Sequence, residues 1–212
     1  MKNKIQEPKI SNNLGIPTNV IDEIFEEEYL ENKIIENTTI SGIYEVRLSL
    51  NSCIFKNVEF ESCDFRKIDI TDVIFENCNL SNINFDDSGI YRTKFVNCKL
   101  TGTLFEDAIL KDVEFKDCLG RYSNFSFSKF KGVLITDSDF QNAVFQEVQN
   151  NKLILNSSDL NSSIFSGTQL NGVDFTTSSI DGCEVKLNDL SGATFSVAQT
   201  LELAKLMGII IK

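Results

Sequence analysis

The sequence has no histidine, only two prolines and no long apolar run, and each absence excludes a class of protein. Without histidine, no nucleophile can be activated by a histidine base, and neither a glycine-rich phosphate loop nor a zinc-ligand spacing is present. No stretch approaches the roughly 18 apolar residues of a membrane span, and no basic N-terminal segment leads into an apolar run as in a signal peptide. We therefore expect a cytoplasmic protein that is not an enzyme and that uses no metal or cofactor.

Basic residues are also in deficit. The chain has 20 Lys and Arg against 31 Asp and Glu, which gives a net charge of −11. Direct binding to DNA or RNA is not expected, because neutralising phosphates requires Lys and Arg. An acidic surface is suited to a basic partner, although the same charge also serves solubility alone.

Large apolar residues recur along the chain with a period of five. From Leu50 to Phe115 every fifth residue is large and apolar, and 15 of the 17 Phe lie on this register between Phe55 and Phe195. The residues two positions earlier are mostly small or β-branched and include all six cysteines. Neither a helix nor a strand produces such a period, which indicates a repeat architecture.

The register runs without an insertion from residue 30 to residue 195. Glu45, Gly120 and Asn150 replace the core residue, and none of them shifts the frame. We interpret Gly120 and Asn150 either as local bulges or bends or as tolerated defects. Phe alternates with Leu or Ile along the register, which favours a coil of four five-residue sides that closes after twenty residues. About 34 units then make about 8.5 coils.

Individual units resemble a known repeat. Cys63-Asp64-Phe65-Arg66-Lys67 and Ser158-Asp159-Leu160-Asn161-Ser162 follow the pattern of the pentapeptide-repeat proteins: a small residue, Asp or Asn, Leu or Phe, then two polar residues. The resemblance implies an all-β solenoid, a right-handed quadrilateral β-helix with a C-terminal capping and dimerisation helix. It divides the chain into an N-terminal segment (1–28), the β-helix (29–196) and the C-terminal helix and tail (197–212).

The N-terminal segment has two interpretations. Thr18 is a candidate N-cap for a short helix through Val20 and Phe25, but an extended segment laid along the shaft fits equally well. Ile34, Ile54 and Ile74 are twenty apart and should form an outward apolar ladder. Either this is ordinary surface, or the N-terminal segment or a partner packs on it.

Two further columns follow from the twenty-residue coil. Asn37, Asn57, Asn77 and Asn97 should stack at a corner and hydrogen-bond through their amides. Cys78, Cys98 and Cys118 should stack inside the shaft. A disulfide or a metal column is one interpretation, but we favour small apolar filler, because parallel side chains lack disulfide geometry.

Acidic residues are densest at two neighbouring corners. Asp86, Asp87, Glu106 and Asp107 should share one corner of adjacent coils, and Asp72 and Asp112 should lie one corner further round with Arg92 between them. These six acidic residues are our candidate partner-binding residues. They form either a docking patch for a basic surface or a solvated face.

The C-terminal region should form an amphipathic helix. Val197, Leu201 and Ala204 follow a helical spacing, Ser196 is a candidate N-cap, and Gly208 is a candidate stop. A solenoid needs a cap, but this apolar arc is wide enough to leave a surface for a symmetric dimer. The candidate dimer residues are Val197, Leu201, Ala204, Leu206, Met207 and Ile209.

The same ending narrows the family resemblance. Asp189-Leu190-Ser191-Gly192, then a helix, then Leu206-Met207-Gly208-Ile209-Ile210 resembles the ending of Qnr-type quinolone-resistance proteins. That resemblance implies a homodimer joined by its C-terminal helices, which mimics DNA, binds DNA gyrase and topoisomerase IV, and protects them from fluoroquinolones. The uninterrupted register places the chain with members that lack inserted loops. The alternative is a protein-interaction scaffold with a non-topoisomerase partner bound at the Ile34, Ile54 and Ile74 ladder.

Overall fold

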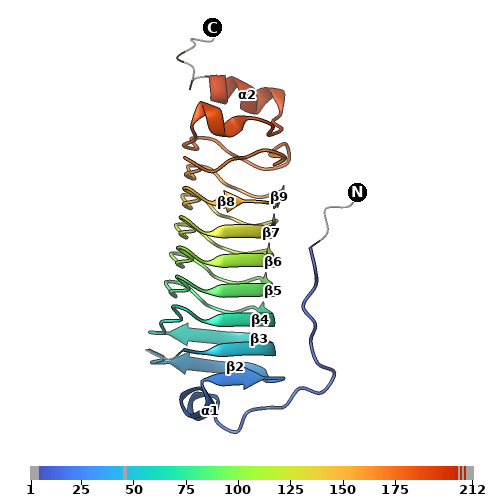
Figure 1. Ribbon diagram of the computed structural model, residues 1–212, viewed down its shortest axis with the longest axis vertical. Coiled ribbons are helices and arrows are strands. Elements are labelled where there is room, and N and C mark those ends of the chain that lie inside the picture. Colours follow the sequence, from blue (N-terminus) through green and yellow to red (C-terminus); the bar gives the residue numbers. More distant parts are fainter. Residues whose placement is uncertain (1–4, 45–46, 205, 207, 209–212) are drawn as a thin grey trace.

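A computed structural model describes residues 5–44, 47–204, 206 and 208. It shows a straight shaft of stacked coils with a helix at each end (Figure 1). In chain order the elements are α1 Val20–Glu27, β1 Tyr29–Glu31, β2 Ile34–Ser41, β3 Ser49–Glu61, β4 Asp69–Glu76, β5 Gly89–Val96, β6 Ile109–Lys116, β7 Lys129–Thr136, β8 Gln149–Asn150, β9 Leu153–Asn156, the 3-10 helix Leu187–Leu190 and α2 Val197–Ala204.

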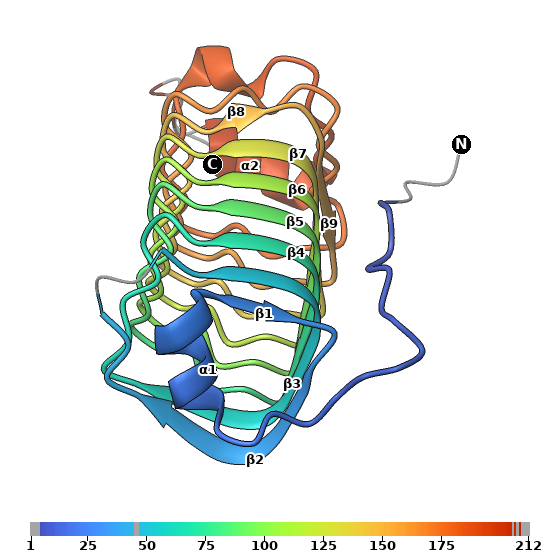
Figure 2. The ribbon, with the colours of Figure 1, turned by 60° about the horizontal axis from the view of Figure 1, so that its bottom comes forward.

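Each coil contains twenty residues, because parallel pairs join positions twenty apart. Leu50 pairs with Ile70, and Ile70 pairs with Ile90. The long strands stack in the order β1-β3-β4-β5-β6-β7-β8 and form one wall of the shaft (Figure 2). From Glu59 and Asn79 onward, isolated bridges keep the same offset as far as Asp174 and Thr194. The four-sided right-handed β-helix is therefore confirmed.

The number of coils is slightly lower than expected. The regular solenoid has about six turns, against the predicted value of about 8.5. The difference arises beyond β9, where the described coils pair through single bridges on other sides of the shaft. Counting five-residue units therefore overestimates how much of the chain forms a regular ladder.

The core consists of two aromatic walls. Phe55 and Phe75 stack with ring centroids 5.0 Å apart, and the rings of Phe105 and Phe125 on the other wall are 4.8 Å apart. Rings from opposite walls meet edge to face, as Phe95 and Phe105 do at 6.4 Å and 80°. Each such pair contributes about 0.5–1.5 kcal/mol beyond the area it buries. The alternation of Phe with aliphatic residues thus produces two continuous stacks.

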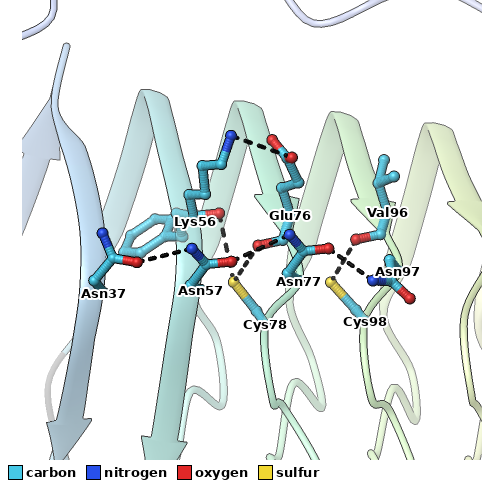
Figure 3. Close-up of polar contacts among 10 residues, drawn as sticks. Asn37, Lys56, Asn57, Glu76, Asn77, Cys78, Val96, Asn97 and Cys98 are labelled. Atoms are coloured by element: carbon cyan, nitrogen blue, oxygen red, sulfur yellow. Dashed lines mark hydrogen bonds and ion pairs between the residues drawn. The ribbon is translucent and has the colours of Figure 1, made fainter.

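The corners are held by side-chain ladders (Figure 3). The amide of Asn57 donates to Asn37 at 2.8 Å, Asn77 donates to Asn57 at 3.1 Å, and Asn97 donates to Asn77 at 2.7 Å. All four residues have φ between 51° and 55°, a left-handed conformation that Asn tolerates. The predicted amide ladder is confirmed.

The cysteines act as small core residues. All six are free thiols. The Sγ of Cys78 donates to the carbonyl oxygen of Phe55 at 3.4 Å, and the Sγ of Cys98 donates to that of Phe75 at 3.3 Å. The two thiols appear in Figure 3, each also facing a carbonyl of its own coil. The hydrogen bond between the Cys98 and Cys118 thiols, together with burial, raises the pKa of Cys98 to about 12, so the thiol is the stable form. The cysteines therefore act as small apolar filler of the core and not as disulfide partners.

Gly120 does not interrupt the backbone ladder, because its N–H donates to the Asp139 carbonyl oxygen at 2.7 Å. A Cβ at this position would lie 2.3 Å from Cε1 of Phe140, one coil further on. The Phe140 ring therefore occupies the space that the absent side chain leaves, and it also packs 5.7 Å from the Phe115 ring. The missing side chain at Gly120 is thus compensated by the larger side chain at Phe140 on the adjacent coil. Glu45, the first register break, lies outside the described residues.

Helix α1 closes the first coil, but its N-cap is Asn19 and not Thr18. The side-chain oxygen of Asn19 accepts from the N–H groups of Ile21 at 3.1 Å and Asp22 at 3.4 Å. The Thr18 N–H donates instead to the Glu23 carboxylate at 3.3 Å. The predicted Thr18 cap is therefore wrong by one residue, and Asn is at least as good an N-cap as Thr. Ile24 is buried against the core.

Helix α2 closes the other end through a capping box. The Ser196 hydroxyl accepts from the Gln199 N–H at 3.3 Å, and the Gln199 side-chain oxygen accepts from the Ser196 N–H at 2.8 Å. The Gln199 amide also donates to the carbonyl oxygens of Phe175 at 2.9 Å and Ser178 at 2.8 Å. It thereby supplies a donor for the Ser178 carbonyl oxygen at the end of the shaft and a second donor for the Phe175 carbonyl oxygen, which also accepts from the Ser178 N–H at 2.9 Å. The predicted Ser196 cap is confirmed.

Candidate functional site

Four of the predicted acidic residues share one corner, which we call the acidic corner: Asp86, Asp87, Glu106 and Asp107. The Asp87 N–H donates to the Glu106 carbonyl oxygen at 2.9 Å, so the two pairs lie on adjacent coils. Asp87 and Asp107 are exposed at φ 58° and 55°, whereas Asp86 and Glu106 are half-buried. The twenty-residue spacing brings these four residues together as predicted.

Within the acidic corner the carboxylates have different roles. Asp86 Oδ1 accepts from the Glu106 N–H at 2.7 Å, and Asp86's own N–H donates to Asn84 at 2.8 Å. Partial burial raises the pKa of Asp86, although hydrogen bonds to its carboxylate from the Glu106 N–H and the Asn84 side chain oppose the change. Asp86 therefore supports the turn, and the exposed charge comes from Asp87 and Asp107.

Exposed aromatic residues follow the acidic corner on the next coil. Phe127 continues the column of Asp87 and Asp107 and is 44% exposed, and Tyr122 is 62% exposed. Both have φ near 60°, a conformation that bulky residues rarely adopt. Exposed aromatics are enriched in protein interfaces. Our sequence analysis missed these two residues. They could have been noticed because an aromatic side chain is unusual at a corner position that Asn, Asp or Gly occupies in most other coils.

A hollow of about 800 Å³ lies beside Phe127, where the strand wall ends. Its lining combines both charges and amides: Asp107, Phe127, Lys129, Phe130, Lys131, Glu147, Val148, Gln149, Asn150, Asn151, Gly167 and Gln169. The Asn150 amide donates to the Gln169 carbonyl oxygen at 3.1 Å, while its own oxygen is buried and accepts no hydrogen bond among the described residues. The second register break thus lines a surface depression.

The second predicted acidic corner, at Asp72 and Asp112, is partly covered, and Asp112 is half-buried. Asp72 is only 7% exposed, and Arg92 binds both its oxygens, at 2.7 and 2.8 Å. The Lys9 N–H donates to Asp72 at 2.9 Å, and the Gln6 N–H donates to Asp112 at 3.1 Å. Burial opposes ionisation of Asp72, but the bonds from Arg92 and Lys9 outweigh it and hold its pKa below the ordinary value.

These donors belong to residues 5–11, which we call the N-terminal strap. The strap runs extended along the outside of the shaft from the level of β7 towards α1 (Figures 1 and 2). Glu7 pairs with Lys94, which continues the column of Ile74. Ile34, Ile54 and Ile74 are half-buried. The N-terminal region therefore contains both a helix and an extended segment, and Asp72 and Asp112 face the chain's own backbone.

The C-terminal helix leaves apolar side chains uncovered. Val197 is 83% exposed, Leu201 is 49% exposed and Leu206 is 44% exposed, while Ala204 is half-buried. Met207 and Ile209, the other two predicted dimer residues, lie outside the described residues.

The described residues contain no cluster of three or more His, Cys, Asp or Glu that could hold a metal ion. Within the same part of the chain, no helix is long and apolar enough to cross a membrane.

The geometry defines a four-sided parallel β-helix whose corners carry the variable side chains. Residues 68–143 match the pentapeptide repeat region family, and residues 138–176 match eight copies of the pentapeptide repeat. The chain belongs to the pentapeptide-repeat proteins. Residues 18–105 also match the SV2A/B/C luminal domain family.

Solved structures show the same fold. One trypsin-treated variant of QnrB1, a plasmid-mediated fluoroquinolone resistance protein, is 19% identical over 87% of this chain and 98% of its own, with a TM-score of 0.50. A second such variant is 17% identical over 84% of this chain and 98% of its own, also with a TM-score of 0.50. At these identities the likeness concerns the fold. Among curated proteins, none matches the sequence.

Proposed function

We propose that the protein is a DNA mimic that binds DNA gyrase and topoisomerase IV and protects them from fluoroquinolones. The supporting observation is the acidic corner: exposed carboxylates of Asp87 and Asp107 stacked on a rigid shaft whose net charge is −11. Adjacent coils are about 4.8 Å apart, comparable to the rise of about 3.4 Å between phosphates of one DNA strand. The fold shared with QnrB1, a fluoroquinolone resistance protein, supports the choice of partner.

The exposed aromatics extend the proposed contact. Phe127 follows Asp107 in the same column, so a basic partner surface that reached both carboxylates would also meet an aromatic ring. Because the twenty-residue offset continues through the described coils, the proposal assigns protection to the shaft and not to inserted loops.

Gyrase supercoiling in the presence of ciprofloxacin, with the purified protein titrated in, tests this function. Restored supercoiling is the expected result. Inhibition without rescue would mean that the protein competes with DNA but does not protect, and no effect in either direction would refute the proposal.

The contribution of the acidic corner is tested with Asp87→Asn combined with Asp107→Asn. Both side chains are exposed, and Asp86 is left intact because it supports the turn. Topoisomerase binding should weaken about tenfold and lose part of its salt dependence. The matched control is Asp117→Asn with Asp137→Asn, the same charge change on adjacent coils at another corner. Equal weakening by both pairs would remove the acidic corner from the proposal and leave net charge as the cause.

We also propose that two copies join through the C-terminal helices. Exposed Val197, Leu201 and Leu206 form an apolar face at the end of the shaft, which a second copy could cover symmetrically. Leu201→Asp with Leu206→Asp should give a monomer by sedimentation equilibrium. A wild-type protein that is already monomeric at micromolar concentration would contradict this part of the proposal.

The exposed aromatics Tyr122 and Phe127 favour one alternative, a protein-interaction scaffold with a non-topoisomerase partner. A pull-down in which Phe127→Ser removes the captured protein, and no topoisomerase subunit is present, would support the scaffold instead.

A further inference from the structure

The N-terminal strap is bound by the shaft in the manner of a peptide ligand. Three of its N–H groups donate to side chains of one corner column: Ser11 to Ser52 Oγ at 2.8 Å, Lys9 to Asp72 Oδ1 at 2.9 Å, and Gln6 to Asp112 Oδ1 at 3.1 Å. Residues 52 and 72 lie on adjacent coils, and residue 112 lies two coils beyond residue 72, so an extended chain running along the shaft can reach all three acceptors.

Side chains at the far end of the strap add chemical selectivity. Ile5 is 9% exposed, and its Cγ2 lies 3.3 Å from the place where a Cβ on Gly132 would stand. Gly132 has φ +93° and follows Asp112 in the column, so the glycine leaves a notch for the branched side chain. Glu7 pairs with Lys94, whose ammonium also lies 3.0 Å from Glu114.

These contacts hold the strap without making it part of the shaft. Gln6, Glu7 and Lys9 are exposed on their outer side. Within the described residues, the first bridge between the N-terminal region and a coil comes only at Gly15 and Lys33. A segment with few buried contacts and exposed backbone hydrogen bonds opens at low free energy, so it can leave while the coils stay stacked.

We propose that the corner groove from Ser52 to Gly132 is a peptide-binding site, that the N-terminal strap is its resident ligand, and that an extended segment of a protein partner replaces the strap. The partner segment carries a branched apolar residue for the Gly132 notch and, two positions later, a carboxylate for Lys94. Its free N–H groups bind Ser52, Asp72 and Asp112. This site is independent of the proposed topoisomerase contact, which uses a different corner.

The test uses the full chain with a weakened strap, Ile5→Asp combined with Glu7→Lys. A fluorescent peptide with the sequence of residues 1–13 is titrated with each protein, and binding is followed by fluorescence anisotropy. In the wild type the strap competes at an effective concentration of about 1 mM, so the peptide should bind the weakened variant at least about tenfold more tightly. Glu26→Lys, an exposed substitution in α1 with the same charge reversal as Glu7→Lys, should leave peptide binding at the wild-type level.

Specificity is tested with a peptide that itself carries the two substitutions of the weakened variant. It should not bind either protein. Equal binding of both peptides, or no binding of the natural peptide to a weakened variant that keeps the wild-type circular dichroism spectrum, overturns the proposal.

A second measurement needs no substitution. In the wild type, hydrogen exchange at the Gln6, Lys9 and Ser11 amides should accelerate when unlabelled peptide is added at about 10 mM, because the peptide displaces the strap. Exchange at Phe95, inside the shaft, should stay unchanged. Strap exchange that does not respond to the peptide contradicts a shared groove.

Discussion

The exchange of size between Gly120 and Phe140 predicts a strong coupling between two substitutions. Gly120→Leu in the wild-type background places a Cβ 2.3–2.7 Å from three ring atoms of Phe140. Both residues are fully buried, so the ring has no free space to enter. Overpacking of this kind costs about 1–3 kcal/mol of the free energy of unfolding.

Phe140→Leu alone should also destabilise the protein, by about 2 kcal/mol, for the opposite reason. The ring contacts with Phe115 at 5.7 Å and Phe125 at 6.0 Å are lost, and space opens above Gly120. Combined, the two substitutions restore the leucine pattern that the column has at Leu100 and Leu160. We expect the double variant to lie within about 1 kcal/mol of the wild type, a favourable coupling of roughly 3 kcal/mol.

Urea unfolding followed by far-UV circular dichroism measures this coupling, since the slope with denaturant reports whether each variant unfolds over the same surface. As a control, Phe140→Leu with Val58→Ala, several coils away, should be additive within about 0.5 kcal/mol. If the Gly120 and Phe140 substitutions were also additive, so that the double variant was less stable than either single one, the size-exchange argument would be wrong.

Three further predictions concern stability. Asn150→Leu should raise the free energy of unfolding by about 1 kcal/mol in urea, because it removes a buried amide oxygen that accepts no hydrogen bond among the described residues, and a loss would contradict this. Asp72 has its pKa lowered from 3.8, chiefly by Arg92 acting against burial. The stability that ionised Asp72 contributes is therefore present above pH 3.8 and is lost as the pH falls through the folded-state pKa. Asp72→Asn should lower the free energy of unfolding at neutral pH and flatten its decrease at acid pH. An unchanged decrease at acid pH would refute the assignment. Gln199→Ala should cost about 1–3 kcal/mol, because it removes the donor to the buried Ser178 carbonyl oxygen and half of the capping box, and it should speed hydrogen exchange in the last coils but not at Phe95.

The sequence by itself determined the parts of this protein that depend on period. Once coils repeat every twenty residues, spacing along the chain becomes contact in space, so the Phe stacks, the Asn37 ladder and the acidic corner at Asp87 and Asp107 could all be placed without coordinates. The Ser196 cap was predictable for a similar reason, because a capping box is local in sequence.

Only the tertiary structure decided the contacts that no period relates. The strap residues Gln6 and Lys9 reach Asp112 and Asp72, which are 106 and 63 positions away, because an extended segment can lie along any corner of a regular shaft. The repeat makes the corners similar in backbone, so the choice depends on local acceptors and on the notch at Gly132, which appear only after packing. For the same reason Asp72 could be placed beside Arg92 from the sequence, but its burial under the strap could not.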